Sequence, residues 1–380
     1  MRLIGTARAP VGAELGRDVL IGRADGTPLL RAGVALTPRY RELLLQAGVS
    51  AIYVEDTESE GIFVESAVDD VTRSIATRAV ASAYERARKA IRGGGQMTTD
   101  SVDSLKDVVQ RILDRIANAG DAALALADLS SADAYTFQHS IDVAAVGLLI
   151  GNRYFRDYGW VDFRGERHFG DISSRLSTLG LGLILHDIGK LTVPVSVLNK
   201  PGRLTDEEWT VMRAHPRAGV DMLGGSDWSP LVKAVVLRHH ERWDGSGYPS
   251  GKVADQIHPM ARIAAVADVF DAITSARPYA VAQPACVGVR AILDGAGTLF
   301  DPEVVDAFAK TVAPFPVGAE VELTDGSSGI VASIPPHVID RPTVRVIAGP
   351  RAGSEVALLY ETDLRIVGWE SVSAPAVALA

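Results

Sequence analysis

The sequence predicts a multidomain, mainly α-helical protein, with a helical bundle between a small N-terminal α+β module and a small C-terminal β module. Three observations support this fold class. The middle of the chain consists of apolar stretches of helical length that contain most of the histidines. Short runs that alternate apolar and polar residues occur near the two ends. Three consecutive glycines, at 93–95, separate the first part of the chain from the bundle.

These changes of pattern divide the chain into four segments. We expect an N-terminal α+β module at 1–64 and a connecting helix with a glycine linker at 65–97. The helical core is expected at 98–313, and a C-terminal β module with a loose tail at 314–380.

Composition narrows the class of protein. The chain has 380 residues, enough for two or three domains, and a net charge of −9, which gives no support for non-specific binding to a nucleic acid polymer. Its single cysteine, Cys286, forms no intrachain disulfide and suits a reducing compartment. No uncharged run reaches membrane-spanning length, and the first residues lack a secretory leader. We therefore expect a cytoplasmic protein without a membrane segment.

The first two segments contain no catalytic group of residues. Residues 19–30 predict a hairpin around Asp25-Gly26, Thr37-Pro38 begins a short helix that reaches Gln46, and residues 51–54 predict a strand. We expect a packing or regulatory role for this module. Residues 65–91 predict a charged helix, which suits either a dimerising or signal-relay segment or a plain connection.

The core and the C-terminal module have different periodicities. Residues 179–191, 206–223 and 261–275 predict helices. The last of these is almost wholly apolar, so its two aspartates, Asp268 and Asp271, are costly to bury unless they are paired or bound to a cation. From residue 314 the alternation predicts a small β-barrel or curled sheet.

Seven side chains of the core are candidate metal ligands. Five of the eight histidines fall there, and each neutral imidazole offers a nitrogen lone pair that a transition metal accepts. Two aspartates add oxygen ligands, one of which can bridge two ions, and a two-metal site activates water and clamps a phosphodiester. Successive groups are at least two dozen residues apart, so we expect them on different helices of a bundle. The candidates are His139, His186, Asp187, His215, His239, His240 and Asp268.

Each candidate also has a structural interpretation. His139 alone could be a core histidine, His186-Asp187 a capping pair, His215-Pro216 a helix boundary, and His239-His240 a helix end. We favour metal binding because these separate explanations would have to coincide. For the other three histidines, His168, His258 and His337, structural roles are expected.

Two motifs stand in order along the core. His186-Asp187-Ile-Gly-Lys190 precedes the run from His239-His240 through Gly247-Tyr248-Pro249, and residues 299–303 follow. In these segments the chain resembles the HD-GYP family, metal-dependent phosphodiesterases that open cyclic di-GMP. The resemblance covers residues 98–313 and implies an all-helical HD-type bundle core.

The resemblance also implies roles for single residues. One divalent ion, iron or manganese, would be held by His139, His186, Asp187 and Asp268, and a second by Asp187, His215, His239 and His240. Asp187 would be the bridge and, with Lys190 on the phosphate, a catalytic residue. Lys190, Arg277, Tyr248, Gly247 and Pro249 would contact the substrate, and Asp271 would support a ligand one turn away.

The chain departs from the family pattern at three places. Ala280-Val281 stands where the family often has cationic residues, so one substrate contact is expected to be missing. Residues 153–177 are additional and contain six aromatic residues, which predict either a stacking lid or partner surface, or an excursion that buries its own rings. Tyr135 stands at the position of a glutamate that helps some members to hold a third ion, and Asp133 lies on another helix face, so we expect two ions.

The expected activity is hydrolysis of cyclic di-GMP to linear pGpG, with GMP as an open further product. The alternatives are a catalytically weak cyclic-dinucleotide receptor or signalling scaffold, and a phosphohydrolase acting on another nucleotide. The complete ligand set favours the enzyme. A homodimer or a signalling protein partner is left open.

Overall fold

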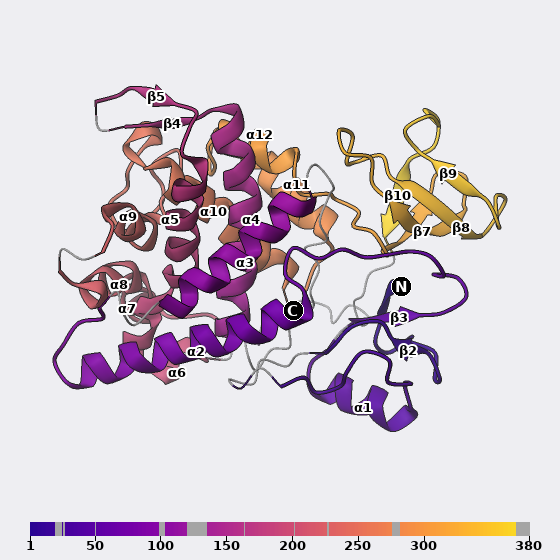
Figure 1. Ribbon diagram of the computed structural model, residues 1–380, viewed down its shortest axis with the longest axis horizontal. Helices are drawn as coiled ribbons and strands as arrows, with labels where there is room; N and C mark the ends of the chain where they lie inside the picture. The colour runs from indigo at the N-terminus through magenta and orange to yellow at the C-terminus, as the bar shows by residue number, and fades with distance from the viewer. Residues whose placement is uncertain are drawn as a thin grey trace.

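The computed structural model describes residues 1–19, 25, 27–49, 51–98, 103–119, 135–162, 164–200, 202–225, 228–275 and 282–369. The described residues form a helical core and two small terminal modules, as the ribbon shows (Figure 1). The largest hydrophobic cluster joins helices between residues 67 and 312, and smaller clusters lie in the N-terminal and C-terminal modules. The mainly helical core with small β elements at both ends agrees with the expected fold class. Within the described ranges, no helix is both long and apolar enough to span a bilayer.

The N-terminal module is an antiparallel sheet covered by one helix. Thr37 caps this helix by accepting a hydrogen bond from the backbone N–H of Tyr40. The sheet has the order β1-β3-β2. Val19 and Leu30 pair as the sequence predicts, although residues 20–24 and 26 of that hairpin lie outside the described residues. The elements are β1 (Arg2–Gly5), β2 (Glu14–Leu15), α1 (Pro38–Gln46) and β3 (Ala51–Glu55).

Helix α2 (Asp70–Arg92) is part of the helical core and not a free connection. Four of its alanines (Ala76, Ala79, Ala83 and Ala87) and Val80 belong to the same hydrophobic cluster as the ligand-bearing helices. The buried guanidinium of Arg73 lies 2.7 Å from the carboxylate of Asp142 on α4. The expected boundary at residue 97 therefore cuts one hydrophobic cluster, because the apolar face of α2 is buried against the bundle.

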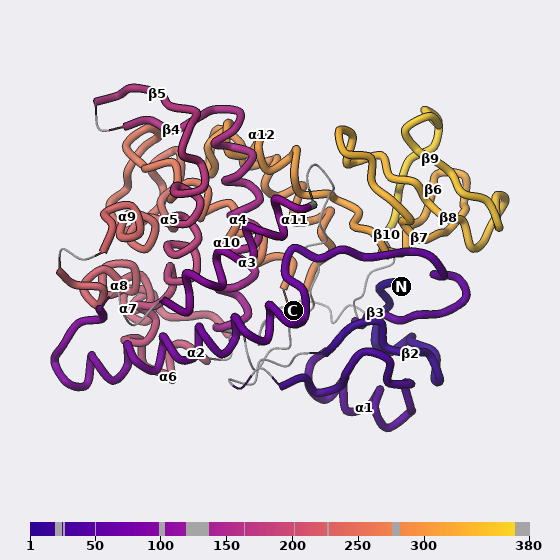
Figure 2. The backbone as a smooth tube through the Cα atoms, viewed as in Figure 1, coloured from indigo at the N-terminus to yellow at the C-terminus, as the bar shows by residue number. Residues whose placement is uncertain are grey.

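The helical core packs around α4, α5 and α10. Helices α2 and α3 lie across α4 and α5, as the backbone trace shows (Figure 2). The helices of the core after α2 are α3 (Asp103–Ala119), α4 (Tyr135–Asp157), α5 (Ile172–Leu185), η3 (Ile188–Thr192), α6 (Val195–Leu198), α7 (Asp206–Arg213), α8 (His215–Leu223), α9 (Pro230–Arg238), η4 (Ala254–Gln256), α10 (Pro259–Thr274), α11 (Ala285–Asp294) and α12 (Pro302–Ala309).

Two of the expected helices are interrupted. The helix expected at 179–191 ends at Leu185 and continues as the 3-10 helix η3. The helix expected at 206–223 is broken at Ala214, and Pro216 stands in the first turn of α8. Proline has no N–H and is tolerated in the first turn of a helix, whereas in a helix interior it would remove a hydrogen bond. Both breaks lie next to candidate ligands.

The additional segment at 153–177 comprises the end of α4, a short hairpin and the start of α5, and the hairpin packs its own rings. Strands β4 (Trp160–Val161) and β5 (Arg167–His168) pair, and the rings of Trp160 and His168 stack with centroids 4.5 Å apart. The guanidinium of Arg175 lies 3.6 Å from the Trp160 ring centroid. These contacts favour the folded excursion over an open stacking surface.

The C-terminal module is a five-stranded antiparallel sheet in the order β10-β6-β7-β8-β9. It meets the N-terminal module, because the N–H of Leu3 donates to the carbonyl of Gly318 at 2.8 Å and Arg2 pairs with Glu320 at 2.7 Å. The expected sheet after residue 314 is therefore present. Its strands are β6 (Glu320–Leu323), β7 (Ser328–Ser333), β8 (Thr343–Ala348), β9 (Glu355–Ala357) and β10 (Ile366–Trp369).

Candidate metal centre

The core brings the seven candidate ligands together from separate elements. His139 lies on α4, the pair His186-Asp187 between α5 and η3, and Asp268 on α10. The remaining three histidines lie at the first turn of α8 and directly after α9. All seven side chains are buried except that of His240, which is 23% exposed.

The ligand atoms form two groups with Asp187 between them. Atoms of His139, His186 and Asp268 lie within 4.8 Å of one another, as do atoms of Asp187, His215, His239 and His240. Oδ2 of Asp187 lies 3.6 Å from Nε2 of His139 and 3.5 Å from Nε2 of His186. Its Oδ1 lies 3.3 Å from Nε2 of His215. Asp187 thus turns one oxygen towards each group.

Hydrogen bonds behind the rings point four histidines into the centre. In each ring Nδ1 faces an oxygen acceptor, so the neutral imidazole carries its proton at Nδ1 and keeps the Nε2 lone pair for a cation. The acceptors are Asp271 for His139 (2.6 Å), the carbonyl of Leu183 for His186 (2.6 Å), that of Met212 for His215 (2.8 Å) and that of Val236 for His239 (3.0 Å).

A buried polar atom at the centre tests whether a cation fits. Oδ1 of Asp187 is buried and accepts no hydrogen bond from any residue that the structure describes. Such an atom costs free energy unless it meets a donor or a cation. A neighbouring Nε2 atom that carries a lone pair has no proton to donate to this oxygen. The donor set of nitrogen and oxygen atoms therefore fits first-row divalent ions.

Burial and the neighbouring charges keep most of the candidate ligands in the protonation state that binds a cation, which is an ionised carboxylate or a neutral imidazole. Burial lowers the pKa of His240 to about 4 and that of His239 well below its usual range. Burial would raise the pKa of Asp187, but Lys190 and the neighbouring histidines hold it well below its usual range. Burial likewise opposes protonation of His139, yet Asp268 and Asp271 outweigh it and raise its pKa to about 9. At neutral pH the carboxylate of Asp187 is ionised, and the rings of His239 and His240 are neutral.

Gly189 permits the close approach that joins the two halves of the centre. A Cβ at this position would lie 1.9 Å from the carbonyl oxygen of His215 and 2.6 Å from the N–H nitrogen of Gly219. Only a residue without a side chain lets η3 and α8 meet here. No role was predicted for Gly189 from the sequence, although its position between Asp187 and Lys190 in the motif could have indicated a close backbone contact.

The loop after α9 covers one side of the centre. The Tyr248 ring stacks on His240 with centroids 4.6 Å apart, and a Cβ at Gly247 would lie 2.4 Å from the carbonyl oxygen of His240. Pro249 follows Tyr248 in the loop. Glu241 holds the loop by accepting hydrogen bonds from the N–H groups of Ser250 (2.8 Å) and Lys252 (3.0 Å). Sequence reasoning missed Glu241, because its partners are set by the fold of the loop.

Cationic side chains lie beside the centre. Nζ of Lys190 is 2.5 Å from Oδ2 of Asp187. The guanidinium of Arg213, an exposed residue that the sequence analysis did not single out, lies 5.5 Å from the Tyr248 ring centroid. Arg277 and Ala280-Val281 lie outside the described residues. Asp271 supports His139 as described, and its other oxygen accepts a hydrogen bond from the hydroxyl of Ser275 at 2.7 Å.

Comparisons with known proteins identify an HD domain and several similar proteins. Residues 170–304 match the family model described as HD domain. A cyclic di-GMP phosphodiesterase of Pseudomonas aeruginosa is 37% identical over 276 residues, which cover 70% of this chain and 63% of that protein. A cyclic di-GMP phosphodiesterase response regulator of Xanthomonas campestris is 50% identical over 128 residues, 33% of this chain and 34% of that protein. An HDG"Y"P protein from Bdellovibrio bacteriovorus aligns with a TM-score of 0.42 and 14% identity, over 80% of this chain and 97% of that one.

The fold and the site first define a protein with an HD domain, in which a histidine-aspartate pair lies at the centre of a helical bundle. With the Gly247-Tyr248-Pro249 loop beside that pair, the chain is similar to the HD-GYP family, and its matched relatives are named cyclic di-GMP phosphodiesterases. The chain spans 63% of the length of the first relative and 34% of the second.

Proposed function

We propose that the protein is a metal-dependent phosphodiesterase that hydrolyses cyclic di-GMP to linear pGpG. The observation that carries the proposal is the convergence of seven ligand side chains, six of them buried, at a centre where Oδ1 of Asp187 is buried and unsatisfied. Two relatives that match this chain are named cyclic di-GMP phosphodiesterases, which supports the same substrate here.

The proposed centre holds two divalent ions, with Asp187 shared between the two groups of ligands. Nitrogen and oxygen ligands suit iron or manganese. When bound, such ions supply a nucleophilic water at neutral pH and neutralise charge on the phosphodiester. We propose two ions and not three because Tyr135 stands at the sequence position where a third ion would need a carboxylate. A neutral phenol is a poor ligand for a hard cation. A two-ion centre is proposed to stop at the linear dinucleotide.

Residues of the chain would orient the substrate around the ions. The ammonium of Lys190, beside Asp187, is suited to hold a non-bridging phosphate oxygen. Tyr248 offers a ring and Arg213 a guanidinium at the same side of the centre, suited to a guanine base and its phosphate. Arg277 is proposed to contact the nucleotide, and its replacement by alanine should weaken substrate binding without loss of metal. Gly247 and Pro249 would shape the loop that carries Tyr248.

The alternative, a catalytically weak receptor or scaffold, is not favoured. A receptor needs to hold the dinucleotide but has no need for seven converging metal ligands. Burying two carboxylates among five imidazoles costs free energy that a cation offsets. The ligand set is therefore better explained by an enzyme.

The test combines metal analysis with turnover. We would purify the full chain without added metal, measure its iron, manganese and zinc content, reload it, and assay cyclic di-GMP hydrolysis. Asp187→Ala should lose most of both ions and reduce turnover at least a thousandfold, since Asp187 faces both groups. Asp221→Ala removes an exposed carboxylate on α8 and serves as the matched control.

Each outcome bears on one part of the proposal. A variant Asp187→Ala that keeps its metal and its activity would refute the bridging role. Three well-occupied ions per chain would refute the number of two. Normal metal content without turnover of any cyclic dinucleotide would favour the receptor.

A further inference from the structure

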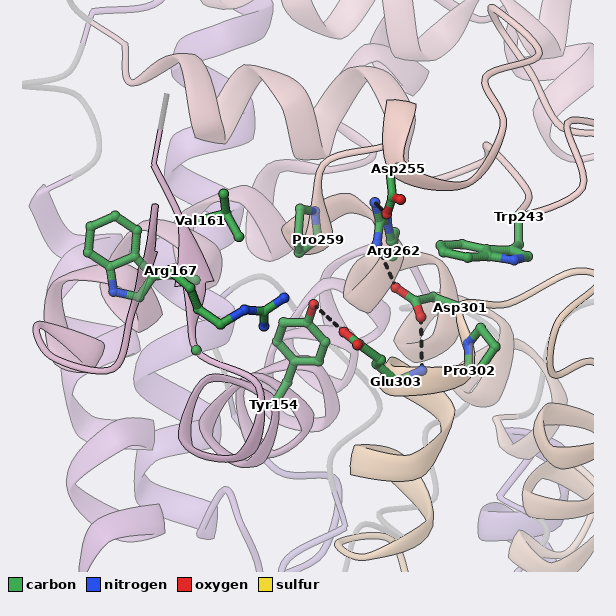
Figure 3. A pocket seen from close by; sticks show the side chains of 12 residues that line it. Tyr154, Val161, Arg167, Trp243, Asp255, Pro259, Arg262, Asp301, Pro302 and Glu303 are labelled. Atoms are coloured by element: carbon green, nitrogen blue, oxygen red, sulfur yellow. Dashed lines mark hydrogen bonds and ion pairs between the residues drawn. The ribbon is translucent and has the colours of Figure 1, made fainter. Parts of the chain in front are cut away.

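A second pocket lies between the β4–β5 hairpin and the first turns of α10 and α12 (Figure 3). Its volume is about 570 Å³, within the range of small-molecule sites. Its walls include Tyr154, Trp160, Arg167, Trp243, Arg262 and Glu303. None of the described residues that line it is a candidate metal ligand.

One wall of the pocket is a fixed ion-paired framework. The buried guanidinium of Arg262 lies 2.8 Å from Asp301 and 3.0 Å from Asp255, and its Nε donates to the carbonyl of Ile257 at 2.6 Å. These bonds engage all three of its nitrogens. Arg262 also lies over the Trp243 ring, 4.9 Å from the centroid. This wall is rigid and presents an aromatic ring without offering a free charge.

Two other charged groups remain available to a ligand. The carboxylate of Glu303 accepts a hydrogen bond from the Tyr154 hydroxyl at 3.3 Å, which is long for a bond between two oxygens. The guanidinium of Arg167, an exposed residue of β5, donates through Nη1 to the carbonyl of Tyr158. It points towards the Tyr154 hydroxyl from the opposite side of the pocket, with Nε and Nη2 left for a ligand (Figure 3). A ligand here meets an acceptor on one side, a donor on the other, and flat rings between them.

We propose that this pocket binds the guanine base of a small nucleotide. Guanine carries two adjacent donors, N1–H and the N2 amino group, which match a carboxylate such as that of Glu303. It also carries two acceptors, O6 and N7, which a guanidinium such as that of Arg167 contacts bidentately. Adenine lacks the paired donors, so Glu303 selects against it. The Trp243 ring and the proline walls supply stacking surface, whereas the faces of the Trp160 ring are already covered by His168 and Arg175.

The site is connected to the metal centre by the chain itself. Trp243 follows His240 by three residues, and Arg262 precedes Asp268 by six residues on α10, about 9 Å along the helix. A guanine nucleotide in the pocket would therefore contact Trp243 and Arg262, each of which is a few residues from a candidate metal ligand. The inference rests on the proposed function only in that the reaction would supply guanine nucleotides as products.

Calorimetric titration of the full, metal-loaded chain with guanosine monophosphate and adenosine monophosphate tests the proposal. We expect guanosine monophosphate to bind at least tenfold more tightly. Glu303→Gln, which still accepts from Tyr154, should weaken its binding at least tenfold, and Arg167→Ala should weaken it several-fold. Glu166→Gln removes a neighbouring exposed carboxylate that does not line the pocket and should leave binding unchanged.

A second titration separates this pocket from the metal centre. Chelator-treated protein and the Asp187→Ala variant should bind guanosine monophosphate with unchanged affinity, whether or not the protein turns over cyclic di-GMP. Loss of binding together with the metal would overturn the proposal, as would equal affinity for the two nucleotides. Unchanged binding in both Glu303→Gln and Arg167→Ala would overturn it as well. Arg167 lies on the exposed hairpin, so its variant remains informative if Glu303→Gln fails to fold.

Discussion

Asp271 joins a metal-centre histidine to the end of its own helix. One carboxylate oxygen lies 2.6 Å from Nδ1 of His139, and the other accepts from the hydroxyl of Ser275 at 2.7 Å. Ser275 is buried and caps α10 by donating its N–H to the carbonyl of Asp271. Ser275 therefore holds the carboxylate of Asp271 in place, and this carboxylate holds the His139 ring. Ser275 acts as a positioning residue.

Replacing Ser275 by alanine should weaken metal binding. Loss of a residue that hydrogen-bonds a metal ligand typically lowers metal affinity roughly ten- to a hundredfold. Ser275 contacts such a residue, Asp271, and not the ligand itself, so we expect a loss of about tenfold. Titration of metal-free protein with manganese, followed by spectroscopic or calorimetric detection, measures the effect. Ser275→Thr keeps the hydroxyl and should recover most of the affinity.

Thr274→Val is the matched control for this experiment. It removes the neighbouring hydroxyl, which donates to the carbonyl of Phe270 and does not touch Asp271. Equal metal affinity in Ser275→Ala and the wild type would contradict the positioning role.

Among the elements, the contact between η3 and α8 is the tightest at the centre. It depends on Gly189, where a Cβ would overlap the carbonyl oxygen of His215. Backbone atoms cannot move aside as the end of a flexible side chain can. The two elements carry Lys190 and His215, so their separation would open the centre.

Gly189→Ala should therefore destabilise the protein and loosen the metal centre together. Overpacking in a tight contact costs about 1–3 kcal/mol, and we expect the upper part of that range here. Chemical denaturation and metal content measure the two effects. Gly170→Ala, where an added Cβ meets nothing within 4 Å, should change neither. A fully stable, metal-loaded Gly189→Ala variant would show that η3 can shift without cost.

Helix α2 is tied to α4 by a buried ion pair. Arg73 and Asp142 are 6% and 8% exposed at the side chain and lie 2.7 Å apart. Asp142 also accepts hydrogen bonds from the amide of Gln138, the residue before His139. The segment next to the glycine run thus contacts the helix that carries a candidate ligand.

Removal of the Arg73 side chain should cost about 3 kcal/mol of unfolding free energy. The cost arises because Arg73→Ala leaves the buried carboxylate of Asp142 without its cation. Urea denaturation measures it. Arg153→Ala breaks a partly exposed pair with Asp157 and should cost less than about 1 kcal/mol. Similar losses in the two variants would argue that the Arg73 pair is effectively solvated.

At the scale of the whole molecule, the two terminal modules meet each other. Arg2 pairs with Glu320, and the N–H of Leu3 reaches the carbonyl of Gly318. Each module has its own hydrophobic cluster, and the cluster of the helical core ends at Val312. We propose that the helical core is a folding unit separate from the C-terminal sheet.

Deletion of residues 314–380 should leave a folded, metal-loaded helical core. Helical circular dichroism and metal content per chain are the measurements. The full-length Glu320→Ala variant is the control, because it removes the contact to Arg2 and keeps the sheet. Insolubility of the shortened chain beside a soluble Glu320→Ala variant would show that the sheet and the bundle share a core.

The sequence by itself determined the local structure and the residue types of the centre. Thr37 and Pro38 predicted the start of α1, and the glycines at 93–95 the end of α2, because caps and helix breakers act over a few residues. The periodicity predicted a helical core and a terminal sheet. The candidate ligands could be selected because five of the eight histidines fall in the core, because a carboxylate inside an apolar helix requires a partner or a cation, and because the motifs stand in the order of the HD-GYP family.

Only the tertiary structure decided how these residues face one another. Asp271 and His139 are 132 positions apart in the chain, and their hydrogen bond exists because α4 packs on α10. The burial of α2, the role of Glu241 and the pocket beside Trp243 likewise arise from packing between distant segments. Helix caps are fixed by neighbours in sequence, whereas the partner of a buried polar group is fixed by which faces the folded chain brings into contact.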